Sequence, residues 1–201
     1  MQRILILAIV ALSLLAPSLA AIPYRPRPGE PEDTATPRVV IETNHGRIVI
    51  ELYADKAPIS VKNFLQYVDD QYYDGTIFHR VIADFMIQGG GYVPNLIEKN
   101  TREPIKNESA NGLSNERGTI ATARTSVPDS ATAQFFINTK DNKNLDRANS
   151  PDKVGYCVFG KVIEGMNVID QIRLMKTGQR NGHGDVPVED VVIRSMRRAA
   201  K

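Results

Sequence analysis

The chain has 201 residues, of which 42% are hydrophobic, enough to bury a sizeable core in one globular domain. Its 25 Lys and Arg residues nearly balance its 23 Asp and Glu residues, so the formal net charge is only +2. Proteins that bind nucleic acid usually concentrate basic charge on one face, and this balance argues against nucleic acid as a partner.

Residues 1–20 have the composition of a cleaved secretory signal peptide. A charged start with Arg3 precedes an apolar run from Ile4 to Leu15, and the small residues Ser18 and Ala20 occupy the positions that a signal peptidase reads. An uncleaved membrane anchor is the alternative, but this run is short for a bilayer, which needs ~20 apolar residues. We therefore expect an exported protein with no membrane attachment in its mature form.

Residues 21–37 contain five prolines among charged residues and threonines. A stretch of this composition buries little apolar area, so we expect an extended or disordered lead-in, with a proline-rich docking ligand as the alternative. The folded domain is then predicted to cover residues 38–196. A basic tail at 197–201 follows it, which we expect to be solvated and frayed.

The folded domain starts with two β-branched runs, 38–43 and 47–52, which predict a hairpin around Asn44-His45-Gly46. Pro58 then suits the first turn of a helix, whose apolar positions recur at helical spacing as far as Asp69. The later elements are predicted from the same patterns: strands at 76–82, 85–89, 119–123, 133–138, 156–162 and 188–195, and a helix at 166–174.

Eight strands with two helices far apart in sequence favour a mainly β fold, a closed eight-stranded antiparallel β-barrel capped by two α-helices. Two long stretches, 91–118 and 139–155, lack a regular pattern. Loops of that length inside a compact domain are uncommon and are often functional.

The segment from Phe78 to Gly90 has the most informative chemistry. Strict alternation places Arg80 on the same face as Phe78 and Ile82, and it places Met86 with Gln88 after the turn. A guanidinium buried alone beside apolar side chains costs several kcal/mol, so a partner or a ligand is expected near Arg80.

A second constellation lies in the strand predicted at 133–138. Alternation puts Gln134, Phe136 and Asn138 on one face and Phe135 with Ile137 on the other. One of the two aromatic rings therefore shares a face with polar side chains. Taken singly, Phe136 reads as an ordinary core residue, and the same holds for Phe85 and Met86. The pattern alone therefore leaves both a core and a binding role open.

No cluster of nucleophiles or metal ligands stands out. Cys157, the only cysteine, lies in an alternating strand and is expected to be a buried structural thiol, so no internal disulfide can form. His79 is expected to be a hydrogen-bonded histidine of the barrel interior. His183 and Asp185, in Gly182-His183-Gly184-Asp185, fall short of a ligand set, so this segment is predicted to be a flexible turn. We expect neither a metal nor a cofactor.

Taken together, three groups of residues resemble the cyclophilin family of peptidyl-prolyl cis-trans isomerases, in order and at the family's spacing from Val39 to Ser195. They are Phe78-His79-Arg80-Val81-Ile82 through Phe85-Met86-Ile87-Gln88-Gly89-Gly90, then Gln134-Phe135-Phe136-Ile137, then Val158-Phe159-Gly160-Lys161-Val162 with Gly165-Met166. Arg124 after Ala123, and Tyr156, resemble the periplasmic bacterial branch, which implies a periplasmic or otherwise secreted enzyme.

The resemblance also implies roles for particular residues. Arg80 would donate a hydrogen bond to the nitrogen of a substrate proline, and Gln88 would bind the substrate backbone. The apolar socket for the proline ring would consist of Phe85, Met86, Phe136 and Leu145, with Tyr156 as a wall. Gln134 would support Gln88 or Arg80, and Ala123 and Arg124 would offer mainly main-chain groups to the residues before the proline.

Two positions depart from the best-known eukaryotic members of that family. Asn144 stands where those proteins have a tryptophan, and Tyr156 where they have a histidine. The tryptophan contributes to binding the cyclic peptide cyclosporin, so we expect weak cyclosporin binding with catalysis retained.

The implied partners are proline-containing unfolded or partly folded polypeptides, and the protein is expected to act as a monomer that assists the folding of exported proteins. Two other functional classes remain open at this stage. One is a proline-peptide binding module or holdase with incidental isomerase activity. The other is a subunit of a cell-envelope assembly that uses the lead-in as a tether.

Overall fold

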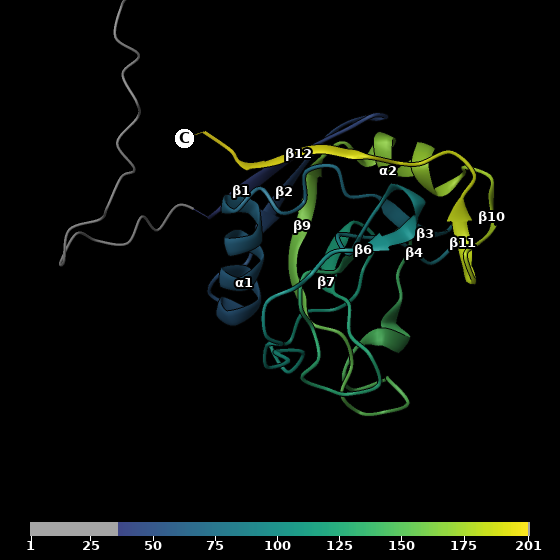
Figure 1. The fold of residues 1–201 in the computed structure, drawn as a ribbon. Coiled ribbons are helices and arrows are strands. Elements are labelled where there is room, and N and C mark those ends of the chain that lie inside the picture. Colours follow the sequence, from purple (N-terminus) through teal and green to yellow (C-terminus); the bar gives the residue numbers. More distant parts are fainter. Residues whose placement is uncertain (1–35, 201) are drawn as a thin grey trace, which may run out of the picture. The chain divides into compact units, whose positions relative to one another are not determined.

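The computed structural model describes residues 36–200 (Figure 1). The predicted signal peptide, and the lead-in as far as residue 35, lie outside the described residues. Within residues 36–200, no helix is both long enough and apolar enough to cross a membrane.

The fold is built on one eight-stranded antiparallel sheet with the strand order β12-β1-β2-β9-β7-β8-β4-β3. Its strands are β1 (Arg38–Thr43), β2 (Gly46–Leu52), β3 (Phe78–Ile82), β4 (Met86–Gly89), β7 (Thr119–Thr122), β8 (Phe135–Asn138), β9 (Val158–Glu164) and β12 (Ile193–Arg198). The hairpin predicted at the start of the domain is confirmed, since Thr43 pairs with Gly46 across the turn.

The sheet curves into an open half-barrel, so the predicted closed barrel is wrong. Its edge strands β3 and β12 form no ladder with each other, and the segments before them meet at a single bridge between Ile77 and Val192. A hairpin of β10 (Thr177–Arg180) and β11 (His183–Pro187) lies along β3 instead (Figure 1). The segment predicted to be a flexible turn at 182–185 therefore belongs largely to a strand.

The last strand begins and ends later than predicted. It includes Arg197 and Arg198, which the sequence assigned to a frayed tail. Arg197 pairs with Asp74 at 2.6 Å and Arg198 with Asp69 at 2.6 Å, so two ion pairs hold this end of β12 beside α1 and the turn that follows it. The long irregular stretches contain only short elements: β5 (Tyr92–Val93), η1 (Pro94–Leu96), β6 (Ile97–Glu98) and η2 (Lys143–Leu145).

Two helices, α1 (Pro58–Asp69) and α2 (Met166–Arg173), pack their apolar faces on the core inside the half-barrel. The helical stripe predicted from Val61 to Val68 is buried, as are Val168, Ile169 and Ile172 of α2. Burial of these apolar faces, at ~25 cal/mol for each Å² removed from water, is the main source of stability. In the part of the chain that the structure describes, Cys157 is a buried free thiol and forms no disulfide.

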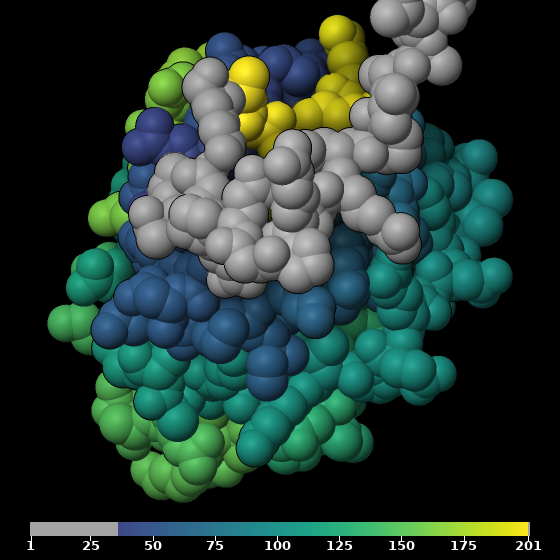
Figure 2. All heavy atoms as spheres, turned by 90° about the vertical axis from the view of Figure 1, so that its left-hand side faces the viewer, coloured from purple at the N-terminus to yellow at the C-terminus, as the bar shows by residue number. Residues whose placement is uncertain are grey.

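A loop residue from far along the chain caps the first helix. The carboxylate of Glu108 accepts hydrogen bonds from the main-chain N–H groups of Ile59 (3.0 Å) and Ser60 (2.7 Å) at the start of α1. Negative charge at a helix N-terminus is favourable, because the first N–H groups have no partner within the helix. Figure 2 shows teal atoms, the colour of residues near 100, lying directly against blue atoms from earlier in the chain.

Candidate active site

The two faces of the sheet have different roles, and strand alternation separates them. On β8, Phe135 and Ile137 point into the main core, whereas Phe136 belongs to a second apolar cluster with Met86 and Val158 on the other face. The predicted split between Phe135 and Phe136 is therefore confirmed. This second cluster forms the floor of a pocket.

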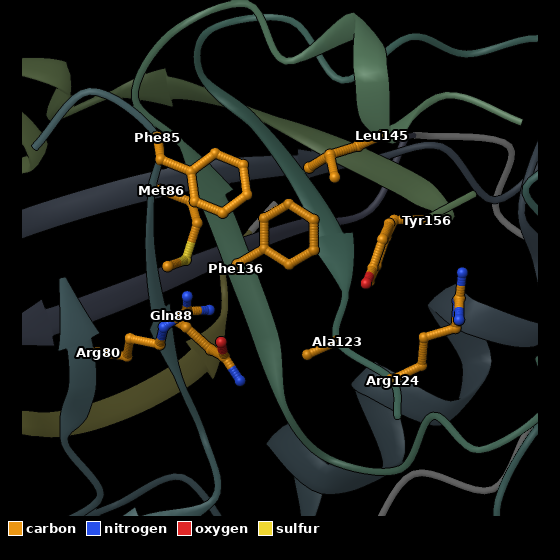
Figure 3. Close-up of a pocket in the computed structure, with 9 residues that line it drawn as sticks. All are labelled: Arg80, Phe85, Met86, Gln88, Ala123, Arg124, Phe136, Leu145 and Tyr156. Carbon is orange, nitrogen blue, oxygen red and sulfur yellow. The ribbon is translucent and has the colours of Figure 1, made fainter. Parts of the chain in front are cut away.

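The pocket has a volume of about 110 Å³. Nine residues line it, all of them predicted site residues (Figure 3): Arg80, Phe85, Met86, Gln88, Ala123, Arg124, Phe136, Leu145 and Tyr156. Sites for drug-sized ligands typically measure about 300–1,000 Å³, so this one suits a single small ring. Apolar side chains form one end of it, and Arg80 and Gln88 stand at the other end (Figure 3).

A β-bulge aims Arg80 into this pocket. Phe78 pairs with Gly89 and Arg80 with Gln88, so His79 is an extra residue on β3 with no counterpart on β4. A bulge of this kind reverses the alternation and redirects the side chain that follows it. Phe78 therefore lies in the main core while Arg80 lines the pocket, and the prediction that they share a face is wrong.

The Arg80 side chain is 42% exposed, and its Nε lies 3.8 Å from a carboxylate oxygen of Asp185 on β11. This distance is too long for a hydrogen bond. Within residues 36–200, the guanidinium donates no hydrogen bond to another protein group. Its terminal nitrogens point toward Gln88 and Phe136 (Figure 3), so its donors are free to bind a ligand in the pocket.

Gln88 is held by Gln134, which is one of the two supporting roles that the family resemblance implied for Gln134. Its Nε2 donates a hydrogen bond of 2.8 Å to Oε1 of Gln134. Gln134 packs against Gly91, where any Cβ would collide with the amide side chain, and its main-chain carbonyl accepts a hydrogen bond from Ala123 at 3.0 Å. Because Gln134 holds Nε2 of Gln88, the side-chain oxygen Oε1 of Gln88 is kept in one orientation.

Arg124 turns its side chain away from the pocket. That side chain is only 2% exposed: it pairs with Asp152, donates to the carbonyl of Gly155 at 3.0 Å and stacks over the Tyr156 ring at 4.5 Å. Main-chain N–H groups of Val154 and Gly155, together with Arg124, hold the pKa of Asp152 well below its usual range. The exposed part of Arg124 is consequently its main chain.

A buried amide network that no motif in the sequence had indicated supports the apolar end of the pocket. Asn142 donates to the Phe85 carbonyl at 2.7 Å and to Oδ1 of Asn138 at 2.8 Å. Tyr156 in turn donates its main-chain N–H to the Leu145 carbonyl at 2.9 Å. The one signal of it in the sequence was the polar residue Asn138, which ends β8 after three apolar residues.

The remaining candidates behave as structural residues. His79 is 5% exposed, and its Nδ1 has no hydrogen-bond partner among the described residues, so the expected satisfied histidine is not found. Burial, and then the proximity of His183, lower the pKa of His79 to about 4. Burial raises the pKa of Cys157 to about 11, as expected for a structural thiol. Over residues 36–200, no group of three or more His, Cys, Asp and Glu residues could hold a metal ion.

Known proteins resemble this chain over the whole described domain. A sequence model of the family described as "Cyclophilin type peptidyl-prolyl cis-trans isomerase/CLD" matches residues 38–198. Peptidyl-prolyl cis-trans isomerase B of Escherichia coli is 56% identical over 159 residues, which are 79% of this chain and 97% of that protein. Peptidyl-prolyl cis-trans isomerase A of Dickeya dadantii is 46% identical over 198 residues, 98% of this chain and 97% of that protein.

Solved structures resemble it as well. A Cryptosporidium parvum cyclophilin type peptidyl-prolyl cis-trans isomerase, crystallised in the presence of the dipeptide Ala-Pro, superposes with a TM-score of 0.70 at 27% identity. The match covers 82% of this chain and 99% of that one.

Proposed function

Because the chain belongs to the cyclophilin-type peptidyl-prolyl cis-trans isomerase family, and is itself a peptidyl-prolyl cis-trans isomerase, we propose how its pocket performs that reaction. The observation that carries the proposal is the position of Arg80, whose free donors stand at the polar end of a small apolar pocket. A proline ring is apolar and brings no N–H group, so a socket of this kind suits it.

Arg80 lowers the rotational barrier. Rotation about the X-Pro bond has a barrier of ~18–20 kcal/mol because it breaks the resonance of the C–N bond. In the twisted amide the nitrogen regains a lone pair that can accept a hydrogen bond. The Arg80 guanidinium donates to that nitrogen and thereby stabilises the twisted state over both planar isomers.

The rest of the pocket holds the substrate on either side of the rotating bond. The rings of Phe85 and Phe136 and the Met86 side chain enclose the proline, so one side of the amide stays fixed. Gln88, braced by Gln134, binds the substrate backbone, and the exposed main chain at Arg124 pairs with extended residues before the proline. Donors fixed before the reaction need no reorganisation in the transition state.

Isomerisation kinetics on a proline-containing peptide, followed by coupled proteolysis, test this assignment. We expect Arg80→Ala to lower turnover about a hundredfold, the scale seen when one preorganised donor is removed. Peptide binding, measured by NMR titration, should persist. Arg38→Ala is the matched control, because Arg38 is an exposed arginine paired with Glu51 on β2. Loss of binding together with turnover would mean that Arg80 anchors the substrate rather than acting on the barrier.

The same proposal includes export and assistance to the folding of exported proteins. Export is supported by the signal-like composition of residues 1–20. Assistance to folding is supported by the exposed main chain at Arg124, which we call the substrate strip, because main-chain groups can bind many different polypeptides. Cell fractionation with N-terminal sequencing of the mature protein tests it. A start near residue 21 in the periplasmic fraction is expected, and an intact Met1 in the cytoplasmic fraction would refute export.

A further inference from the structure

The β10–β11 hairpin brings a carboxylate close to Arg80. Asp185, which does not line the proline pocket, lies 3.8 Å from Nε of Arg80. None of the residues in the segment Gly182-His183-Gly184-Asp185 lines the proline pocket. Resting on the function proposed above, we propose that Asp185 is a positioning residue that orients the Arg80 guanidinium for catalysis.

Two bulges facing each other create this contact. On β3, the extra residue His79 redirects Arg80. On β11, Gly184 and Asp185 stand opposite the single residue Gln179, between the pairs Gly178–Val186 and Arg180–His183. Asp185 there adopts a left-handed backbone with φ of 58°, a conformation that Asp and Asn tolerate better than most residues. Bulges beside active sites commonly aim a side chain, and here both aim at the same point.

The hairpin is anchored firmly enough to act as a support. Val186, the neighbour of Asp185, is 2% exposed and packs with Ile77 beneath β3. The His183 ring contacts Tyr92 edge-on at 5.4 Å between centroids, and Asn181 donates a hydrogen bond of 3.0 Å to the carbonyl of Asn95. The Asp185 carboxylate is therefore carried on fixed backbone, although it is itself 49% exposed.

Asp185 is also distinguished by the cavity that it lines. A second, more polar cavity of about 500 Å³ is lined by residues of β3 and β11, and Arg80 lines both this cavity and the proline pocket. Asp185 is the one carboxylate among the described residues that line the cavity. The Asp185 carboxylate attracts the Nε side of the Arg80 guanidinium. The two terminal nitrogens of Arg80 are then left to face the pocket, which is their orientation in Figure 3.

Kinetics of Asp185→Asn test the proposal. Asparagine keeps the size of the side chain and tolerates the left-handed backbone, but it removes the charge. Since the pair is half-exposed, we expect kcat to fall about threefold to fivefold with KM unchanged. The ¹⁵N–¹H resonance of Arg80 Nε should shift, and added salt should lower the kcat of the wild type toward that of the variant. Glu189→Gln, which removes an exposed charge from the segment after β11, is the matched control with wild-type kinetics.

The same substitution in an Arg80→Ala background separates the possibilities. If Asp185 acts through Arg80, Asp185→Asn lowers kcat no further in that background. An equal loss in both backgrounds, or an unchanged kcat in the single variant while Arg80→Ala loses turnover, would overturn the positioning role alone. Full turnover in Arg80→Ala would overturn the role of Arg80 itself, and the positioning role with it.

Discussion

Stability at mildly acidic pH should depend on His79, the residue inserted in β3 beside Arg80. His79 is buried against the Tyr92 ring at 4.6 Å between centroids, and burial lowers its pKa from 6.5 to about 4. In the unfolded chain the same imidazole takes up a proton near its ordinary pKa. Between these two values the unfolded state binds more protons than the folded state, so the free energy of unfolding falls as pH falls.

The size of the effect follows from the two pKa values. Near pH 7 the imidazole is mostly neutral in both states, and His79 changes the stability little. Each unit of difference corresponds to ~1.4 kcal/mol, so the loss reaches roughly 2 kcal/mol at pH 5 and about 3 kcal/mol at pH 4. This is a large part of the stability of a small domain, which is ~5–15 kcal/mol in total.

Urea unfolding of the wild type and of His79→Phe, monitored by circular dichroism at pH 7 and pH 5, measures this contribution. Phenylalanine keeps a ring against Tyr92 but cannot titrate, so the variant should lose about 2 kcal/mol less than the wild type between these two pH values. His45→Gln, a change at a histidine in the β1–β2 turn, should follow the wild type. Parallel losses in wild type and His79→Phe would refute the argument, because carboxylates elsewhere would then account for the whole decline.

Three further outcomes are expected. Asn144→Trp should raise cyclosporin affinity about tenfold, measured by isothermal titration calorimetry, because Asn144 is exposed on η2 beside the pocket and an aromatic ring there adds apolar contact. An unchanged affinity would show that Asn144 is not the cause of weak cyclosporin binding. Gly160→Ala should lower the free energy of unfolding by about 2–3 kcal/mol in urea, since its Cβ would collide with the Glu51 carbonyl; a loss below ~1 kcal/mol would show that β2 and β9 can separate. Glu108→Gln should cost about 1 kcal/mol through the N-terminus of α1, and Glu103→Gln, an exposed change on the same loop, should cost none.

The sequence predicted the elements whose chemistry is local. The helix from Pro58, the hairpin at Asn44-His45-Gly46 and the two faces of β8 all follow from spacing within one segment, and each is confirmed. Four of the pocket residues lie on β3, β4 and β8, and the others, on loops and on η2, were found through the family resemblance. Alternation alone had left Phe136 between a core and a binding role, so the resemblance to a family was needed to choose.

What escaped prediction depends on pairing between distant segments. A bulge is defined by the partner strand, so strict alternation within β3 wrongly placed Phe78 beside Arg80. The prediction of a closed barrel was wrong for the same reason. The number of strands does not determine whether the two edge strands, here β3 and β12, pair with each other. The Glu108 cap joins residues 48 positions apart in the chain, and Ala57 before the helix offers no side-chain cap to suggest it.

The buried guanidinium of Arg124 has a consequence for which polypeptides the enzyme accepts. In the proposed binding mode, the substrate residues before the proline meet main-chain atoms, which are identical whatever side chains those residues carry. Such a surface selects a segment by its extended conformation and its accessibility rather than by its amino-acid sequence. In folded proteins the main-chain N–H and C=O groups are already hydrogen-bonded. The strip at Arg124 therefore favours unfolded chains, whatever their sequence.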